Sequence, residues 1–285
     1  MYVQGSNEDP GLEMLYMNKI SEYIRCLLQC SGQKKQQAKE MQSSQIIKQA
    51  APDKVGTVKA VKPRPTRTFS QFFEHVKSLG FNPMTIIDVG AARGTPDLYR
   101  NFPDAYLVLF EPLSDFVPEL ENIVSTRAGE YHVCALMSES GSSTILKSAD
   151  KFGSSMMHRI EDTHDQRLVP VNVYTLDEMI KPELQSPMIL KTDCQGGDFD
   201  VIRGGSETLK KCEIVVMEIS LFQFWGEHHP KPLEILNYMN DKGFVLYDFL
   251  DGLFRPYDNA LGQLDMVFVR ENGMFRQCHL WAAPD

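Results

Sequence analysis

Hydrophobic and polar positions follow two alternating patterns along most of this chain. Runs of consecutive apolar residues, typical of strands buried on both faces, alternate with segments in which apolar residues recur every three or four positions, typical of amphipathic helices. The predicted strands cover residues 85–90, 105–112, 130–138, 188–196, 213–220, 243–250 and 263–270. The predicted helices cover 69–80, 96–102, 115–124, 197–212 and 231–242. This alternation predicts an α/β domain with a mostly parallel sheet and helices on both faces.

The N-terminal part of the chain has a different pattern. Residues 1–30 contain one helical segment, in which Tyr16, Ile20, Tyr23 and Leu27 are spaced by four and three positions. This spacing predicts an amphipathic helix, but the seam is shorter than the three to four heptads of a convincing coiled coil. The helix is expected to pack either on the chain's own body or on a second copy, which leaves a homo-oligomer open.

A basic polar segment, residues 31–67, follows this helix. It holds seven Lys and two Arg against two acids, a net charge of +7, so the rest of the chain carries −16 of the total of −9. Proline fixes its own backbone and disfavours helix in the residue before it, so "KPRPTR" should be extended. We interpret this segment as a solvated linker, with contact to a membrane surface or a glycan phosphate as the alternative. The predicted domain then covers residues 68–285.

Composition and charge exclude several classes of protein. The chain has 285 residues, of which 42% are hydrophobic, so it can bury a sizeable core. Its acidic balance argues against a nucleic-acid partner, because binding to phosphates needs clustered Lys and Arg. No secretory signal and no run of about 20 apolar residues is present, so we expect a cytoplasmic protein without a membrane span. The six cysteines form no Cys-x-x-Cys pair, and we expect no metal site.

Five predicted strands end in polar or small residues. In open α/β sheets, ligands bind beyond the carboxyl ends of the strands, so these residues are the first candidates for a site. A buried carboxylate without a partner is costly, and acids at apolar strand ends therefore usually face a crevice or a ligand. The five positions are Asp88, Glu111, Ala135, Asp193 and Glu218.

The stretch "IIDVGAARGTPDLY", residues 86–99, contains the most informative loop. Gly90 and Gly94 allow positive φ and a close approach of the backbone to a ligand. A dinucleotide fold needs Gly-x-Gly-x-x-Gly, whereas here the third glycine is missing and Asp88 would repel a pyrophosphate. The cationic methyl donor S-adenosylmethionine meets no such repulsion. Glu111 is suited to bind ribose hydroxyls in either kind of fold, so it does not decide between the two ligands.

Six blocks of sequence carry a family resemblance. They are "IIDVGAARG", "LFEP", "VPVNVYTLDEMI", "ILKTDCQGGDFDVIRGG", "VVMEIS" and "LGQLDMVFVR", in this order along residues 69–270. Together they resemble the FkbM-type S-adenosylmethionine-dependent methyltransferases. The fourth block is the most specific, whereas a glycine loop alone is common to many folds. The chain departs from the family pattern at Gly197 and Asp198, where a small or aromatic residue followed by Glu is usual.

The resemblance implies a Rossmann-like class I methyltransferase fold, with a seven-stranded, mostly parallel sheet whose last strand is antiparallel. It also implies S-adenosylmethionine as cofactor and O-methylation of a hydroxyl group on a sugar, glycan or related natural product. Asp193 would lie beside the transferring methyl group and is the candidate catalytic residue. The methionine side of the donor would be lined by the 88–94 loop, the ribose by Glu111 and its neighbour, and the adenine by the 135–136 pair. The implied cofactor-binding residues are Asp88, Gly90, Ala91, Ala92, Gly94, Glu111, Pro112, Ala135 and Leu136.

The proton of the acceptor hydroxyl needs a base, for which a carboxylate or histidine is suited. Asp193 is the first candidate, and orientation of the hydroxyl without proton transfer is its alternative role. Four histidines lie in segments that follow strands, and each is expected at the surface unless it covers the acceptor: His158, His164, His228 and His229. The aromatic residues of "SLFQFW", 220–225, fit either core packing or stacking on a sugar.

Two other functions remain open at this stage. One is a non-catalytic domain that binds the methyl donor or acts as a scaffold through the N-terminal helix. The other is an NAD-type oxidoreductase. The sequence does not identify the acceptor.

Overall fold

The computed structural model describes residues 66–149, 151–157 and 167–282, all within one unit, Lys62–Asp285. The predicted N-terminal helix and nearly all of the predicted linker lie outside the described residues. The predictions for those segments, including self-association, therefore stay predictions.

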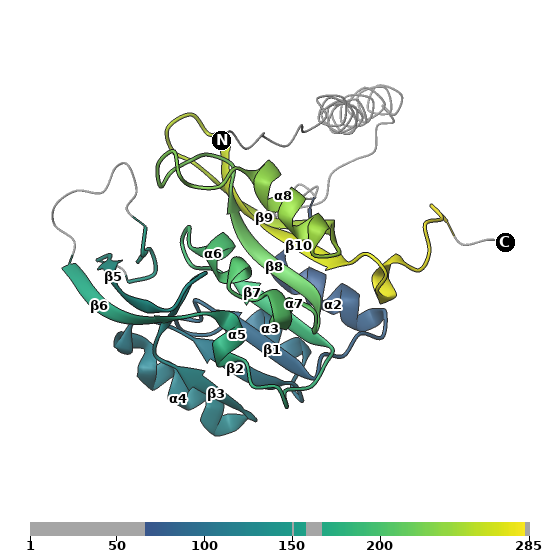
Figure 1. Ribbon diagram of the computed structural model, residues 1–285. Coiled ribbons are helices and arrows are strands. Elements are labelled where there is room, and N and C mark those ends of the chain that lie inside the picture. The colour runs from purple at the N-terminus through teal and green to yellow at the C-terminus, as the bar shows by residue number, and fades with distance from the viewer. Residues whose placement is uncertain (1–65, 150, 158–166, 283–285) are drawn as a thin grey trace, which may run out of the picture. The chain divides into compact units, whose positions relative to one another are not determined.

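The largest sheet of the described domain has seven strands. It lies at the centre of the domain (Figure 1). Its strands are, in spatial order, β3(Gly129–His132), β2(Tyr106–Phe110), β1(Thr85–Val89), β7(Met188–Thr192), β8(Cys212–Ser220), β10(Leu261–Arg270) and β9(Phe244–Phe254). The first five are parallel, and β10 is inserted antiparallel between β8 and β9. This topology confirms the predicted Rossmann-like fold with an antiparallel last strand.

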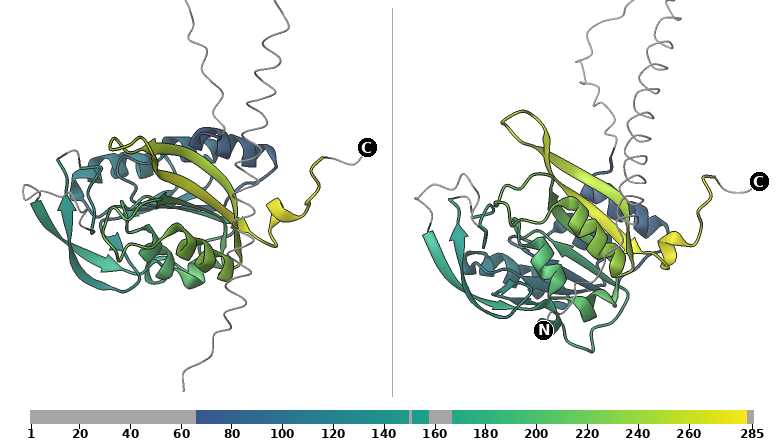
Figure 2. Two further views of the ribbon diagram at one scale, coloured as in Figure 1. Left: turned by 90° about the horizontal axis from the view of Figure 1, so that it is seen from above. Right: turned by 45° about the horizontal axis from the view of Figure 1, so that its top comes forward.

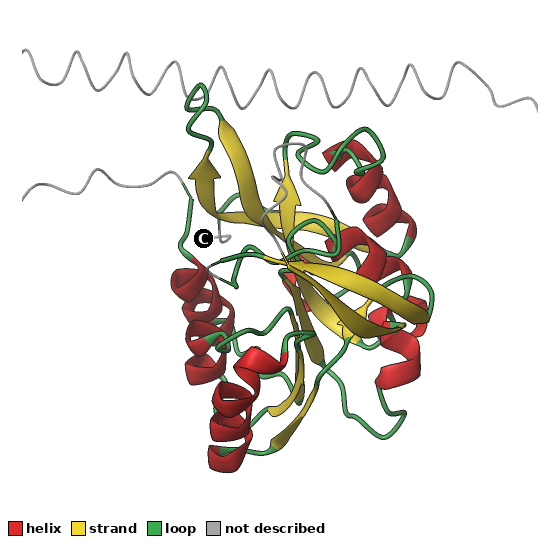
Figure 3. Cartoon of the chain, turned by 90° about the vertical axis from the view of Figure 1, so that its left-hand side faces the viewer, coloured by secondary structure: helices red, strands yellow, loops and turns green. Residues whose placement is uncertain are grey.

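Helices cover both faces of this sheet, as Figures 2 and 3 show. One face carries α2(Phe69–Ser78), α3(Pro96–Asn101) and α4(Val117–Thr126); the other carries α5(Leu176–Met179), α6(Asp198–Arg203), α7(Ser206–Leu209) and α8(Pro232–Asp241). Two short 3₁₀ helices, η1(Ser114–Phe116) and η2(Met274–Arg276), complete the set. The predicted start of a helix near Pro96 is confirmed, because proline at the first helical position loses no hydrogen bond.

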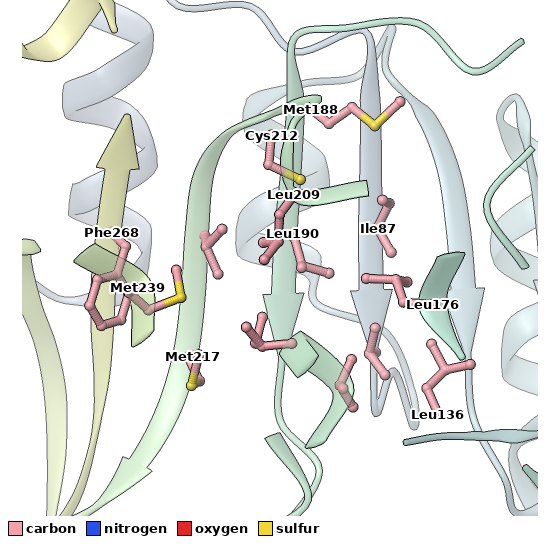
Figure 4. Close-up of a cluster of buried hydrophobic side chains, with 14 of the residues drawn as sticks. Ile87, Leu136, Leu176, Met188, Leu190, Leu209, Cys212, Met217, Met239 and Phe268 are labelled. Atoms are coloured by element: carbon pink, nitrogen blue, oxygen red, sulfur yellow. The ribbon is translucent and has the colours of Figure 1, made fainter. Parts of the chain in front are cut away.

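Alternate residues of the central strands point to the two opposite faces, which divides the core in two. Ile87 and Leu190 pack with Leu176 and Met239 on the α5–α8 face (Figure 4). Ile86, which precedes Ile87 on β1, packs on the α2–α4 face. Burial of each such side chain stabilises the fold by about 1.5–3 kcal/mol, which fixes the strand order and hence the positions of the strand ends.

A second, three-stranded sheet was not predicted. It has the order β4(Ala135–Leu136), β6(Arg167–Tyr174), β5(Gly141–Lys147). The predicted single strand over 130–138 is therefore wrong, since the chain leaves the main sheet after His132. Leu136 is buried beside Leu176 in the α5–α8 core while β4 pairs with β6, and this packing redirects the chain.

The predicted helix over 197–212 is also wrong in detail, because it is divided into α6 and α7 at Gly204 and Gly205. A Cβ atom at Gly204 would lie 3.2 Å from the carbonyl carbon of Met137 and closer to its oxygen, and one at Gly205 would lie 2.6 Å from Leu176. The two glycines thus let the backbone pack directly against the segment that leads into the second sheet.

Among residues 66–282, apart from the gaps, no helix combines the length and the apolar character that a membrane span requires.

Candidate active site

The carboxyl ends of β1, β2 and β7 open into a cavity, here called the inner cavity. The empty space inside it, open mouth included, is about 810 Å³. Seven of the ten predicted site residues line it: Gly90, Ala92, Glu111, Pro112, Ala135, Leu136 and Asp193. These seven residues therefore lie together around one cavity, and their roles in binding or catalysis stay predictions.

The loop between β1 and α3 forms one wall of the inner cavity. Gly90 and Gly94 have φ values of +73° and +84°, and even Ala92 has +43°. A Cβ atom at Gly90 would lie 2.8 Å from the carbonyl carbon of Asp193 and closer still to its oxygen. Gly90 is thus required both by its conformation and by the close approach of the loop that follows β7.

Asp88 lies beneath this loop. The inner cavity is not lined by Asp88, by Ala91 or by Gly94. Asp88 is fully buried; it accepts hydrogen bonds from Thr95 Oγ1 at 2.7 Å and from the Tyr99 hydroxyl. Lys191 Nζ lies 3.2 Å from Asp88 Oδ1 and supplies the opposite charge. Lys191 balances the negative charge of Asp88, and Asp88 does not line the inner cavity. The sequence argument that Asp88 would repel a pyrophosphate therefore does not hold. The contacts of Asp88 instead fix the loop.

Glu111 follows β2 and is held by backbone groups at the cavity wall. Its Oε2 accepts from the Ala92 N–H at 3.0 Å and its Oε1 from the Leu113 N–H at 2.9 Å. Burial raises the pKa of Glu111 above its ordinary value, while the two backbone N–H groups lower it. Each carboxylate oxygen has a second lone pair, so Glu111 can also accept hydrogen bonds from two hydroxyls of a ligand.

The end of the inner cavity next to Glu111 is apolar. Ala135 and Leu136 of β4 line it together with Phe110, Phe116 and Ile145. The second sheet therefore supplies a wall that the main sheet lacks, and this wall has the apolar character that a flat heterocyclic ring requires.

The loop after β7 also lines the inner cavity and begins with Asp193, whose side chain is 41% exposed. Its Oδ1 accepts from Gln195 Nε2 at 3.1 Å, and its Oδ2 lies 3.6 Å from Lys191 Nζ. This loop is fixed from both sides. The Trp225 ring packs so closely on Gly196 that a Cβ there would lie 2.7 Å from the ring, and Ser155 Oγ donates to the Gln195 carbonyl at 2.6 Å.

Two further cavities are lined by Asp265. The adjoining cavity, about 800 Å³ with its open mouth, shares Gly90, Ala92, Phe152 and Asp193 with the inner cavity, and Ala91, Gly94, Lys191 and Asp265 also line it. The hairpin cavity lies against the β9–β10 hairpin and is lined by Glu218, Asp251, Gly252, Leu253, Gln263, Leu264 and Asp265. Asp193 is thus one of the four residues that line both the inner and the adjoining cavity.

Several acids near Asp193 hold their protons more tightly than usual. Burial, followed by the charge of Asp193, raises the pKa of Asp198 to about 6 and that of Glu218 to about 9. Burial disfavours the charged form of Lys191, but Asp88 and then Asp193 raise its pKa above the ordinary value. Lys191 therefore stays charged and forms ion pairs with Asp88 and Asp193.

The remaining candidates from the sequence lie elsewhere. His158 and His164 fall outside the described residues. His228 is exposed, and His229 is buried with its ring 4.9 Å from that of Trp225. Trp225 is only 7% exposed, which identifies core packing rather than a surface for stacking.

Sequence reasoning missed three residues of the site: Lys191, Gln195 and Asp265. Lys191 and Gln195 lie in the specific block "ILKTDCQGGDFDVIRGG" and were available from it. Asp265 was missed because only strand ends were considered. In antiparallel β10, it is the beginning of the strand that reaches the edge where the parallel strands end.

The comparison with known families agrees with this geometry. The family model described as "Methyltransferase FkbM domain" matches residues 88–246, more than half of the chain. The matched segment begins at Asp88 and contains every residue identified above except Asp251–Leu253 and the residues of β10. No curated protein matches the sequence significantly.

Two solved structures illustrate the range of similar chains. The methyltransferase FkbM from Methylobacillus flagellatus KT is 14% identical, with 70% of this chain and 48% of that chain covered and a TM-score of 0.45. This chain therefore spans about half the length of that protein. Magnesium protoporphyrin IX methyltransferase from Synechocystis PCC 6803, solved with bound SAM, is 10% identical, with 70% and 79% covered and a TM-score of 0.41.

Proposed function

Because the chain belongs to the FkbM methyltransferase domain family, we propose that it is an S-adenosylmethionine-dependent O-methyltransferase acting on a hydroxyl of a sugar, glycan or related natural product. The observation that carries the proposal is the position of Asp193, at the boundary between the inner and the adjoining cavity. A methyl transferase needs such a boundary, because the donor and the acceptor must meet there in line.

We infer that S-adenosylmethionine binds in the inner cavity. The apolar side chains of Ala135 and Leu136 support a position of the adenine beside them, and the carboxylate of Glu111 supports a position of the ribose beside it. Gly90 and Ala92 also line the cavity, and we infer that the methionine part lies beside them. When bound, S-adenosylmethionine supplies a methyl group activated by a positively charged sulfur.

The chain's own residues then have to bring an oxygen in line with the carbon and sulfur atoms. Asp193 is partly exposed to the adjoining cavity, and its orientation is fixed by Gln195 and Lys191. We assign to it the hydrogen bond that orients the acceptor hydroxyl. Lys191, Asp193 and Asp265 lie on the wall of the adjoining cavity, and these charged groups favour a polyhydroxylated acceptor over an apolar one.

The proposal is tested by incubating the full-length protein with S-adenosylmethionine and a panel of glycans and small sugars, and measuring a mass gain of one methyl group. Asp193→Asn should lower the rate by at least about 100-fold, because alignment is lost, while S-adenosylhomocysteine still binds. Asp104→Asn is the matched control. Asp104 is exposed between α3 and β2, at the opposite edge of the sheet, so this variant should keep the wild-type rate.

Two outcomes would contradict the proposal. Binding of S-adenosylhomocysteine without turnover of any acceptor would favour a non-catalytic donor-binding domain. Binding of NAD and not of S-adenosylhomocysteine, measured by calorimetry, would favour an oxidoreductase.

A further inference from the structure

Asp265 occupies a distinctive position in the fold. It lies on β10 directly opposite Glu218 of β8, at the edge of the sheet where the parallel strands end. It lines both the adjoining cavity and the hairpin cavity, and among the cavities described it is the one residue that these two share. Asp265 therefore faces the space beside Asp193 and is also connected to the open space next to the hairpin.

The carboxyl group of Asp265 differs from the neighbouring ones in its contacts. Asp193 accepts a hydrogen bond from Gln195, and Glu218 Oε2 accepts from the side-chain amides of Gln195 and Gln263 at 3.3 and 3.1 Å. No N–H or O–H group in the described part of the chain donates to the oxygens of Asp265. A half-buried carboxyl group that lines a cavity and has no such partner is suited to accept a hydrogen bond from a ligand.

The electrostatic surroundings favour a proton on Asp265. Burial, followed by the charge of Asp193, raises its pKa to about 7, whereas Lys191 lowers it. A base whose pKa lies near the working pH combines a useful fraction of the ionised form with a sufficient affinity for the proton. The charged or titratable groups that surround Asp265 are Lys191 from β7, Asp193 from the loop after β7, Asp198 from α6, Glu218 from β8 and Asp251 from β9.

We propose that Asp265 is the group that removes the proton from the acceptor hydroxyl, while Asp193 orients that hydroxyl. The inference rests on the proposed function and adds a second catalytic residue to it. The acceptor oxygen forms a bond to the methyl carbon, and the carbon–sulfur bond breaks with its electron pair remaining on sulfur. The hydroxyl proton passes to Asp265, which becomes a carboxylic acid. It then returns the proton to water through the hairpin cavity.

Kinetics of Asp265→Asn test the assignment. Asparagine has nearly the same size and cannot take the proton, so kcat should fall by about 10²- to 10⁴-fold. The affinity for S-adenosylhomocysteine should stay within about twofold, because Asp265 does not line the inner cavity.

Wild-type kcat/KM for the acceptor should fall tenfold per pH unit below about pH 7, and this decrease at acid pH should be absent in the variant. Asp265→Glu should restore part of kcat, and Asp104→Asn should retain all of it. A wild-type rate and an unchanged decrease at acid pH in Asp265→Asn would overturn the assignment.

A second measurement needs no acceptor. Protein labelled with ¹³C at the aspartate carboxyl groups and saturated with S-adenosylhomocysteine should show one carboxyl resonance with a midpoint near pH 7 that is missing in Asp265→Asn. If the carboxyl resonance that is missing in Asp265→Asn titrates below about pH 5 in the wild type, the assignment is wrong whatever the kinetics show. If no acceptor is methylated by the wild type, the proposed function fails, and the titration alone decides whether Asp265 holds an exchangeable proton at neutral pH.

Discussion

Gly90→Ala is the substitution for which the structure gives the clearest expectation. At φ +73°, alanine costs about 1–2 kcal/mol relative to glycine, because its Cβ crowds the following carbonyl. In addition, the new Cβ would lie 2.8 Å from the carbonyl carbon of Asp193, where ordinary contacts begin at 3.4 Å. Both atoms belong to the backbone of short loops, so no side-chain rotation relieves the clash. The loops after β1 and β7 must therefore separate by roughly 1 Å, a displacement that can lower the rate of an aligned reaction about 100-fold.

The matched control is Gly80→Ala. Gly80 follows α2 with φ +87°, but a Cβ atom there would have nothing within 4 Å. This variant carries the conformational cost without the clash. It should lower Tm by about 2–8 °C and leave donor binding unchanged, since about 1 kcal/mol shifts Tm by about 2–4 °C in a domain of this size.

The assay is calorimetric titration of both variants with S-adenosylhomocysteine, together with thermal unfolding and the methyl-transfer rate. Gly90→Ala should bind at least about tenfold more weakly than wild type, a loss of about 1.4 kcal/mol, and Gly80→Ala should bind like wild type. Wild-type affinity and rate in Gly90→Ala would refute the conclusion that the close approach of these two loops forms the site.

Three further variants test other parts of the structure. Lys191→Met removes the partner of fully buried Asp88 and should lower the free energy of unfolding by about 3–5 kcal/mol in urea titrations; a loss below about 1 kcal/mol would show that the buried charge is compensated in another way. Trp225→Ala removes the ring that packs on Gly196 and should weaken S-adenosylhomocysteine binding and methyl transfer together, whereas loss of acceptor use alone would mean that the ring contacts the acceptor. Glu218→Gln should be more stable than wild type at neutral pH, because burial raises the pKa of Glu218 to about 9, so that the folded protein holds a proton that the unfolded chain releases above about pH 4.3. The stability difference should grow by at most about 1.4 kcal/mol per pH unit up to about pH 9, and a difference that shrinks with rising pH would contradict this sign.

The main sheet was predictable because its strands are short apolar runs separated by helical segments, and this pattern admits few topologies. The second sheet was not. Residues 130–138 form one continuous β-prone run, and only the burial of Leu136 beside Leu176, which are distant in sequence, shows that the run divides between two sheets. The break between α6 and α7 also depends on a contact between residues that are distant in sequence. A helix can contain glycine, so Gly204 and Gly205 did not predict the break, and only the close contact of Gly204 with Met137 explains it.

Part of the candidate site could likewise be predicted from the sequence, and part could not. The rule that ligands bind at the ends of parallel strands placed Glu111 and Asp193 at one cavity without knowledge of the fold. The rule gives no information on ion pairs, so Asp88 was expected to repel an anionic ligand, whereas the structure pairs it with Lys191. It also omits antiparallel strands, and Asp265 could only be recognised once β10 was known to pair with β8.

The most direct test of the account is the chemical position of the transferred methyl group. The full-length protein is incubated with S-adenosylmethionine carrying a ¹³C-labelled methyl group and with the sugar panel, and the product is examined by carbon NMR. The account predicts a methyl ether carbon on a polyhydroxylated acceptor, formed by the wild type and by Asp104→Asn but at least about 100-fold more slowly by Asp193→Asn. A labelled methyl group on carbon or nitrogen, or bound donor product with no transfer to any acceptor, would contradict it.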